Sequence, residues 1–438
     1  MRDLTIFLYE WKHFFRNPFK ILAVFLFIVA GVYGLNNGYS LYQNQTAEIE
    51  KIHEKIQTEK EQYQQQYAEG KLTDDSRPWI DMASPFWAIW YTPTYHIKTP
   101  SPAMVYSIGQ AEQYGFYKRV TFMASPYDAD MAEEIANPER LQTGTLDFAF
   151  VVLFLLPLLL LILLYNIKSA EAEQGFLPLI EVQTASKNSW LISRILFYFL
   201  LVTSVTIGLL IYGAMLTDVF KNASEAFGQI LLYTLLYLAF WSLIFFFILK
   251  NGNSILGNTL QMVGVWLLLA FVIPAIVHQS ISISKPANLM TEFIEVRDKQ
   301  EELYANDSVF ERKLIDLFPE ITKTTAFNDE TKFNSAMSNS AYALVNELNK
   351  EAIRPIEKES QDKNTLIEAT YWFNPVTFFQ NKFNSIAQTN YNDYQVYRDE
   401  IQALIDKRTG VLIEDIWADV KVDTERYKWY SESLSTAR

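Results

Sequence analysis

Five long apolar segments constrain this chain more than any other feature of its sequence. The hydrocarbon core of a bilayer is about 30 Å thick and takes roughly 20 apolar residues of helix to cross, because lipid offers no partner to an unpaired backbone group. Each segment reaches this length with no Asp, Glu, Lys or Arg at its middle. The sequence therefore predicts an α-helical polytopic membrane protein. Its five predicted transmembrane helices are residues 19–40, 146–167, 191–217, 227–249 and 255–278.

The charge of the chain sits in two hydrophilic blocks. Among 438 residues there are 37 Lys and Arg against 50 Asp and Glu, which gives a net charge of −13. The blocks, residues 41–145 and 279–438, carry net charges of −6 and −8, so the rest of the chain is close to neutral. No basic surface is present to release counterions from phosphates, which excludes nucleic acid as a partner. The absence of cysteine excludes disulfides and thiolate chemistry.

Basic residues close to the apolar segments set the expected orientation. Lys and Arg in short loops resist translocation, whereas long acidic domains cross the membrane. Eight bases fall on the side of the N-terminus, against Lys221 alone in the short opposite loop at residues 218–226. We therefore expect a multi-pass protein of the plasma (inner) membrane with a cytoplasmic N-terminus. Both acidic blocks then become extracytoplasmic domains, and the C-terminus lies outside because no apolar segment follows the second block.

The two extracytoplasmic domains are predicted to be mainly helical. Apolar spacing over residues 42–70 indicates that the first transmembrane helix continues outward as a charged strut. The next stretch gathers aromatic residues from Trp79 to Tyr95 among prolines, and we interpret them as a small core in preference to a belt at the lipid headgroups. Asn374-Pro375 is typical of a helix start. In the second domain, helical spacing covers residues 291–305, 309–321, 331–360 and 376–408.

Two cytoplasmic segments stand out from ordinary connections. Residues 1–18 have apolar side chains at helical spacing and bases at the flanks, as in a helix that lies in the plane of the interface. Glu10, Trp11 and Arg16 belong to this predicted interfacial helix. The loop at residues 168–190 has a short apolar turn after Gly175, which permits a tight turn. An exposed apolar turn on this side predicts a docking surface for another protein.

These segments carry a resemblance to a known family. The opening LYEWKHFFRNP resembles the interfacial helix that begins the ABC-2-type permeases, the membrane subunits of ABC exporters. The second apolar segment and the EAEQGFLPLIEVQTASKNSWLISR that follows it resemble the second span and coupling loop of that family, with Phe176 where Thr or Ser is usual. Large outer domains with Asn-Pro motifs at Asn137-Pro138 and Asn374-Pro375 are similar to the subgroup that includes the permease of the nitrous-oxide-reductase maturation system. The family has six spans, and this sequence has five.

The resemblance implies a partner that hydrolyses ATP. No Gly-x-x-x-x-Gly-Lys-[Ser/Thr] loop occurs in the chain, so ATP would be bound by a separate ATP-binding cassette ATPase subunit, and the chain itself would be no enzyme and carry no cofactor. Two permease chains, as a homodimer or with a sister permease, would pair in the membrane lipid, and the outer domains would contact substrate or an envelope protein. The residues that the resemblance assigns to ATPase docking are Glu171, Glu173, Gly175, Leu177, Leu179 and Ile180.

Other chemistry has little support in the sequence. The four histidines, His13, His53, His96 and His278, have no zinc-ligand spacing, and no nucleophile elbow is present. The absence of titratable groups at mid-span favours nucleotide over a proton gradient as the driving force. Sodium sites at helices broken by Pro157 and Pro274 remain an alternative. The alternative function is a non-transporting membrane scaffold or sensor whose outer domains bind an envelope protein.

Overall fold

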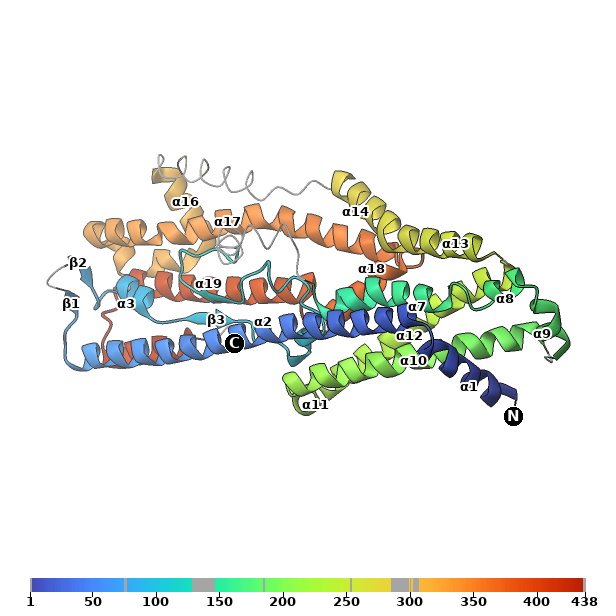
Figure 1. Ribbon diagram of the computed structural model, residues 1–438. Helices are drawn as coiled ribbons and strands as arrows, with labels where there is room; N and C mark the ends of the chain where they lie inside the picture. The colour runs from blue at the N-terminus through green and yellow to red at the C-terminus, as the bar shows by residue number, and fades with distance from the viewer. Residues whose placement is uncertain are drawn as a thin grey trace.

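The computed structural model describes residues 2–74, 77–127, 146–183, 186–252, 254–284 and 307–435, together with residues 299 and 301. It is elongated and predominantly helical (Figure 1). An apolar helical bundle with α8 and α9 forms one end, and a hydrophilic body that contains α16, α17 and α19 forms the other. The predicted Asn137-Pro138 motif, and the predicted helix at 291–305 apart from two isolated residues, lie outside the described residues.

Five helices in the described residues are long and apolar enough to cross a membrane, which indicates a membrane-embedded protein. This agrees with the number of apolar spans expected from the sequence. Three of the spans are the single helices α2, α10 and α12, and the other two are composite. The spans are α2 (Pro18–Ala68); α6 (Phe148–Phe150) with η2 (Val151–Leu155), α7 (Leu156–Leu164) and α8 (Ser169–Glu173); α10 (Lys187–Leu216); α12 (Ser224–Asn251); and α13 (Ile255–Leu267) with η3 (Leu268–Val272) and α14 (Ile273–Ser284).

Helix α2 connects the bundle to the hydrophilic body. It is 51 residues long, so at 1.5 Å per residue it extends about 75 Å, more than twice the thickness of a bilayer core. Asn17 caps its first turn by accepting a hydrogen bond from the Lys20 backbone, and Pro18 occupies the first helical position. The short helix α1 (Arg2–Phe15) ends just before this cap. The outward continuation of the first span, which the sequence predicted, is present.

Two glycines of α2 allow other backbone segments to approach closely. A Cβ at Gly34 would lie 2.8 Å from the backbone nitrogen of Phe148, at the start of the second span. A Cβ at Gly38 would lie 2.5 Å from the carbonyl oxygen of Val105, in the 3₁₀ helix η1 (Pro102–Val105). Any larger residue at either position would force the two backbones apart. The spacing of these glycines fixes where α2 leaves the bundle and meets the hydrophilic body.

Spans two and five depart from α-helical geometry just before their prolines. The π-helical turns η2 and η3 immediately precede the segments that contain Pro157 and Pro274. Pro157 has no N–H for the carbonyl of Leu153, four residues earlier, and the Tyr237 hydroxyl donates to that oxygen at 2.6 Å instead. Such turns are sites where a helix bends. The prolines do interrupt these spans, as expected.

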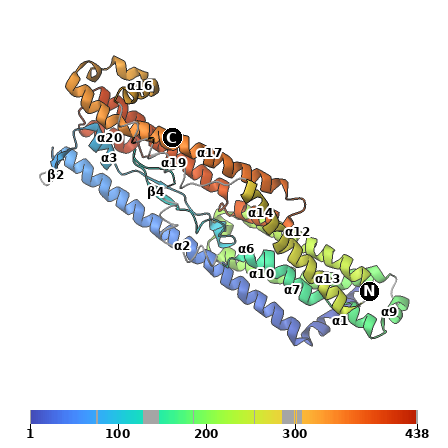
Figure 2. The ribbon, with the colours of Figure 1, turned by 90° about the horizontal axis from the view of Figure 1, so that it is seen from above.

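The hydrophilic body is assembled from both hydrophilic blocks. The second block supplies the long helices, and α17 and α19 run side by side along α2 (Figure 2). Beyond α2, the described residues of the first block form short strands, turns and short helices, so this part is not mainly helical as expected, because its prolines interrupt long helices. The second block contains α16 (Asp307–Leu317), η4 (Pro319–Lys323), η5 (Ala326–Asn328), α17 (Glu330–Ala369), α18 (Pro375–Ile386), α19 (Tyr391–Trp417) and α20 (Thr424–Ser433).

Two small antiparallel sheets come from the first block. One pairs β1 (Thr73–Asp74) with β2 (Arg77–Asp81), and the other pairs β3 (Tyr95–Ile97) with β4 (Tyr117–Arg119). Helix α3 (Pro85–Tyr91) lies between the two sheets in sequence. These strands occur in segments for which the sequence indicated no strand, because each is only two to five residues long and shows no clear alternation.

Hydrophobic clusters join the two blocks into one packed unit. Phe86 and Tyr67 from the first block share a cluster with Leu412 and Tyr427 from the second. The rings of Tyr67 and Tyr427 stack with their centroids 4.2 Å apart. Most of the aromatic stretch around α3 therefore fills a core, although Trp79 is exposed. The core interpretation of these aromatic residues is the one that the packing supports.

Arg408 of α19 ties the blocks together with hydrogen bonds. The side chain is completely buried. Its guanidinium donates to the carbonyl oxygens of Ile89 and Thr92, at the end of α3, and to the Thr94 hydroxyl. Burial lowers the pKa of Arg408 to about 9. The Arg408 guanidinium thus donates hydrogen bonds to carbonyls at the C-terminal end of a helix that belongs to the other block.

Helix α18 connects the hydrophilic body to the bundle. It begins at Pro375 after Asn374, as the sequence predicted. It packs against α12 and against both π-helical turns, η2 and η3 (Figure 1). The ring of Phe379 lies 4.8 Å from that of Tyr237, the same tyrosine that donates to Leu153. Through α18, the hydrophilic body therefore packs against the π-helical turns of spans two and five.

Candidate docking site at the α9 end of the bundle

A buried arginine joins three helices at the end of the bundle that carries α9 (Leu177–Gln183), which we call the α9 end. Arg194 lies in the second turn of α10 and is buried. Its guanidinium forms ion pairs with Glu10 of α1 and with Glu171 of α8, the latter at 2.6 Å. The planar fork of arginine suits two carboxylates at once. We call Glu10, Glu171 and Arg194 the Arg194 cluster.

The surroundings of the cluster keep water away from it. Glu10 is completely buried, and the Trp190 ring lies 4.9 Å from the Arg194 guanidinium. Loss of one member from a buried ion pair typically costs about 3–5 kcal/mol, because the other charge is left without compensation. The relative positions of α1, α8 and α10 are therefore coupled by charge as well as by packing.

Two lysines near the cluster satisfy backbone carbonyls of neighbouring helices. Lys20 donates to the carbonyl of Leu163 at 2.7 Å and to the Tyr198 hydroxyl at 3.2 Å. Lys168 donates to three carbonyls at the end of α12, those of Leu249, Lys250 and Gly252, at 2.8–2.9 Å. These are the carbonyls that the end of a helix leaves unpaired. From the sequence, these lysines served only to predict the orientation of the chain in the membrane.

The Glu173 carboxylate has a hydrogen-bond partner within the same chain. Its carboxylate accepts a hydrogen bond of 2.7 Å from the backbone nitrogen of Ile255, the first residue of α13. A carboxylate at a helix N-terminus is favourable both as a cap and for the helix dipole. Of the six residues assigned to docking, Glu171 and Glu173 thus hold the coupling loop against the bundle.

Gly175 forms the turn between α8 and α9. Its φ of +77° is in the left-handed region, which glycine adopts without strain. No atom lies within 4 Å of the position that a Cβ would take, so the requirement is conformational and not steric. The tight turn expected at this residue is present.

Helix α9 presents apolar side chains in two directions. Leu177 is only 9 % exposed and belongs to the core of the bundle, and Ile180 is partly buried against that core. Leu179 points outward and is 59 % exposed, together with Phe176 at 52 % and Val182 at 87 %. We call Phe176, Leu179 and Val182 the α9 face. Among the residues assigned to docking, only Leu179 contributes a largely exposed apolar side chain.

Helix α1 also has two faces. Glu10 points inward to the Arg194 cluster, whereas Trp11 and Arg16 are exposed. The Trp11 ring packs edge-on against Phe197 of α10, with centroids 6.5 Å apart. The sequence placed Glu10, Trp11 and Arg16 on one interfacial helix, but α1 ends at Phe15 and Arg16 lies in the turn that follows, because Pro18 disfavours helical geometry just before it. Glu10 and Trp11 are both on α1 and point in different directions. Arg194 was missed as a site residue, although it pairs with both Glu10 and Glu171.

No group of three or more His, Cys, Asp or Glu side chains in the described part of the chain is arranged to hold a metal ion. The arrangement at the α9 end offers no nucleophile with an adjacent base. What it can do is bind: an exposed apolar helix face is held at a fixed angle by buried ion pairs and helix caps.

The chain matches one family model. Residues 291–433 match a domain of unknown function, DUF3526, and this match covers most of the second hydrophilic block. No curated protein and no solved structure matches the chain. The matched region includes α18 and the long helices of the hydrophilic body, but neither α9 nor the Arg194 cluster.

Proposed function

We propose that the chain is the membrane-spanning permease subunit of an ABC-type exporter, of the ABC-2 kind. In this proposal the α9 end faces the cytoplasm, and the hydrophilic body lies outside the plasma (inner) membrane. A separate ATP-binding cassette subunit hydrolyses ATP and docks on the α9 face. Two such chains, or this chain and a sister permease, form the membrane unit.

The observation that carries this proposal is the construction of the α9 end. Phe176, Leu179 and Val182 are exposed, and they lie between the apolar spans Phe148–Glu173 and Lys187–Leu216. An apolar face of this kind is a site for a protein partner. Helix α8, which leads into α9 through the turn at Gly175, is fixed by the Arg194 cluster and by the Glu173 cap on α13. A surface built only to be solvated needs neither feature.

The contacts also supply a route for movement. A displacement of α9 would act on α1 and α10 through the Arg194 cluster, and on α13 through Glu173. Spans two and five have π-helical turns at which they can bend, and α18 rests on both turns. We propose that nucleotide-driven movement of the docked subunits reaches the hydrophilic body by this path.

The test is co-purification of the cassette subunit encoded with this chain. A Leu179→Asp, Val182→Asp double variant removes two side chains whose burial is worth roughly 1.5–3 kcal/mol each, so binding should weaken by at least about 100-fold. The matched control is Leu317→Asp, Val309→Asp, which changes exposed residues of α16 in the hydrophilic body. The control should bind like the native chain.

Three outcomes would contradict the proposal. Retention of the cassette subunit by the α9 variant would place docking elsewhere. Transport in sealed vesicles that stops with ionophores while ATP remains would identify a gradient-driven protein. A native complex that hydrolyses ATP without moving any substrate would favour the scaffold function instead.

A further inference from the structure

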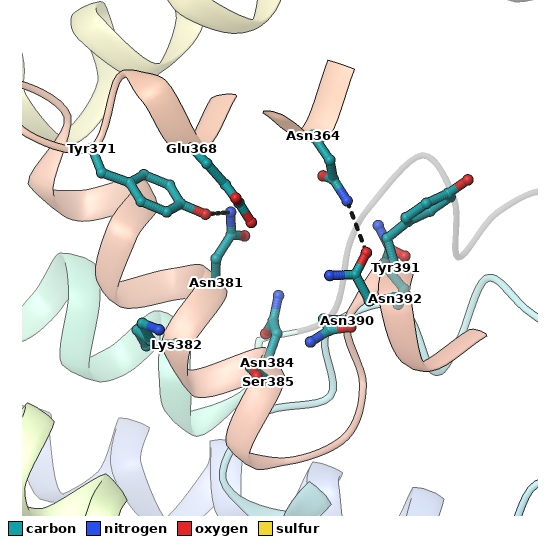
Figure 3. A pocket seen from close by; sticks show the side chains of 11 residues that line it. Asn364, Glu368, Tyr371, Asn381, Lys382, Asn384, Ser385, Asn390, Tyr391 and Asn392 are labelled. Atoms are coloured by element: carbon teal, nitrogen blue, oxygen red, sulfur yellow. Dashed lines mark hydrogen bonds between the residues drawn. The ribbon is translucent and has the colours of Figure 1, made fainter. Parts of the chain in front are cut away.

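A polar cavity lies in the hydrophilic body, where the end of α17, helix α18 and the start of α19 meet (Figure 3). Its volume is about 140 Å³. It is notable for carboxamide side chains, which come from four separate parts of the chain. They are Gln110, Asn364, Asn381, Asn384, Asn390 and Asn392.

Hydrogen bonds at the wall of the cavity orient several amide nitrogens toward its interior. Asn390 accepts from the backbone nitrogen of Asp393 at 2.9 Å through its side-chain oxygen, which directs its Nδ2 the other way. Asn384 accepts from the Ser107 hydroxyl at 2.6 Å through its oxygen. Figure 3 shows the amide nitrogens of Asn384, Asn390 and Asn392 directed into the space between the helices. The cavity thus has a set of N–H donors.

Acceptors lie on the same wall. Asn381 donates its Nδ2 to the Tyr371 hydroxyl at 2.7 Å, and its oxygen is left for another partner. The Glu368 carboxylate points into the cavity beside it. Gln110 lines the cavity too, and its side-chain oxygen is buried with no hydrogen-bond partner. Buried polar atoms are normally paired, so an unpaired one beside a polar cavity points to a missing partner.

This mixture of donors and acceptors selects a class of ligand. An anion would need donors alone, and a cation would need acceptors alone. Glu368 and Lys382 contribute one charge of each sign, so the wall is close to neutral. A hydroxyl group both donates and accepts, as a carboxamide does. A neutral group with several hydroxyls fits this wall better than an ion or an apolar group.

The volume limits the size of the ligand. Sites for drug-sized molecules measure about 300–1,000 Å³, so a cavity of about 140 Å³ takes a single ring and not an oligomer. We propose that this cavity binds one neutral sugar ring. The ring comes either from a soluble glycan or from the headgroup of a glycolipid, since α18 also packs on the apolar bundle. This inference does not rest on the proposed transport function.

Saturation-transfer NMR on the full chain tests the proposal. The protein is placed in phosphatidylcholine nanodiscs without sugar-based detergents, and the probes are methyl glucoside and N-acetylglucosamine. We expect transfer to at least one of them. A second arm adds monoglucosyl diacylglycerol to the nanodiscs. Competition by this lipid against the soluble sugar identifies the headgroup as a source, and its absence identifies a soluble glycan.

Variants separate the cavity from other surfaces. Asn392→Ala removes a donor at the mouth and should weaken binding about tenfold, and Ser385→Trp should abolish it by filling the space. The matched control is Asn334→Ala, an exposed asparagine near the far end of α17. A melting temperature equal to that of the native chain will show that each variant folds.

The proposal is overturned if neither sugar binds the native chain, or if Ser385→Trp binds as well as the native chain does. It is also overturned if glycylglycine, offered as a zwitterionic probe for Glu368 and Lys382, binds more tightly than both sugars. Loss of sugar binding with unchanged binding of the cassette subunit would leave the function of the α9 end intact.

Discussion

Two buried arginines hold the two ends of this molecule, and they do so with different partners. Arg194 at the α9 end is paired with two carboxylates from two other helices. Arg408 in the hydrophilic body has carbonyl and hydroxyl oxygens around α3 as its hydrogen-bond partners. An ion pair can exchange partners or be neutralised by protonation, whereas a backbone carbonyl has one position and no charge. The partners of Arg194 can therefore rearrange, whereas the carbonyl partners of Arg408 cannot.

The largest expected effect tests whether the two ends lie on opposite sides of a membrane. Thr58, Ser335 and Ser186 are exposed, and the chain has no cysteine of its own. With single cysteines at these positions, an impermeant maleimide should label Thr58→Cys and Ser335→Cys in intact cells and leave Ser186→Cys unlabelled until the membrane is opened. The bias of basic residues toward the α9 end gives this direction. Labelling of Ser186→Cys alone would reverse the orientation.

The next effect concerns the Arg194 cluster. Arg194→Met leaves the buried Glu10 and the partly buried Glu171 without a counter-charge, and we expect a loss of about 3–5 kcal/mol in stability, measured by thermal unfolding in nanodiscs. A triple variant with Glu10→Gln and Glu171→Gln added should recover most of this loss, since no charge remains. Lys12→Met on the exposed side of α1 serves as the control.

The triple variant also separates stability from coupling. If the cluster only holds the helices together, the recovered protein should support transport as well as the native chain. If the ion pairs rearrange during the cycle, as we propose, transport should stay low although the cassette subunit still binds. A triple variant as unstable as Arg194→Met would show that the carboxylates are not the source of the loss.

A smaller effect is expected for the other arginine. Arg408→Met leaves the buried Thr92 carbonyl without its donor, whereas the Ile89 carbonyl keeps the backbone N–H of Thr92. One unpaired buried group costs about 1–3 kcal/mol, and part of this is offset because a costly buried charge is removed. We expect a net loss of about 1–2 kcal/mol, confined to the hydrophilic body and visible as faster proteolysis there. Arg354→Met, at an exposed position on α17, should change stability by less than about 0.5 kcal/mol. Equal effects of the two variants would contradict the capping role.

The difference between the two ends also explains what could be read from the sequence. Apolar length located all five spans, and Asn374-Pro375 located a helix start, because both signals are local. The partners of Arg194 and Arg408 are far away in sequence, so no local pattern gives them. The joining of the two hydrophilic blocks was missed for the same reason.

The residues assigned to docking show most clearly what the sequence alone does not predict. Leu177 and Leu179 are both leucines two positions apart on α9, and composition does not tell which one faces the bundle. The direction depends on how α8 is held by Arg194 and on the turn at Gly175. Phe176 and Val182 join Leu179 on the exposed face only once that rotation is known. The resemblance thus indicated a helix for docking, which stays a prediction, but not which face of that helix is exposed.

The smallest effect uses a group in the hydrophilic body that can change its charge. His96 in β3 stacks on the Tyr397 ring with centroids 5.2 Å apart, and its Nε2 lies 3.0 Å from the Glu400 carboxylate. Burial lowers the pKa of His96 below its ordinary value of 6.5, although the charge of Glu400 acts in the opposite direction. The folded state therefore binds this proton less readily than the unfolded state does.

Stability should accordingly be unaffected by His96 above about pH 6.5 and should fall as the pH drops through 6.5 toward the lowered pKa of the folded state. The measurement is thermal unfolding of the native chain and of His96→Asn across pH 5 to 8. The two proteins are compared because the other titrating groups are common to both, so the difference between the two curves reports on His96. The difference between the two curves should grow in the direction of lower pH, with the native chain losing more. A difference that instead shrinks on acidification would mean that the ion pair with Glu400 outweighs burial, and that this part of the hydrophilic body is held by charge as the α9 end is.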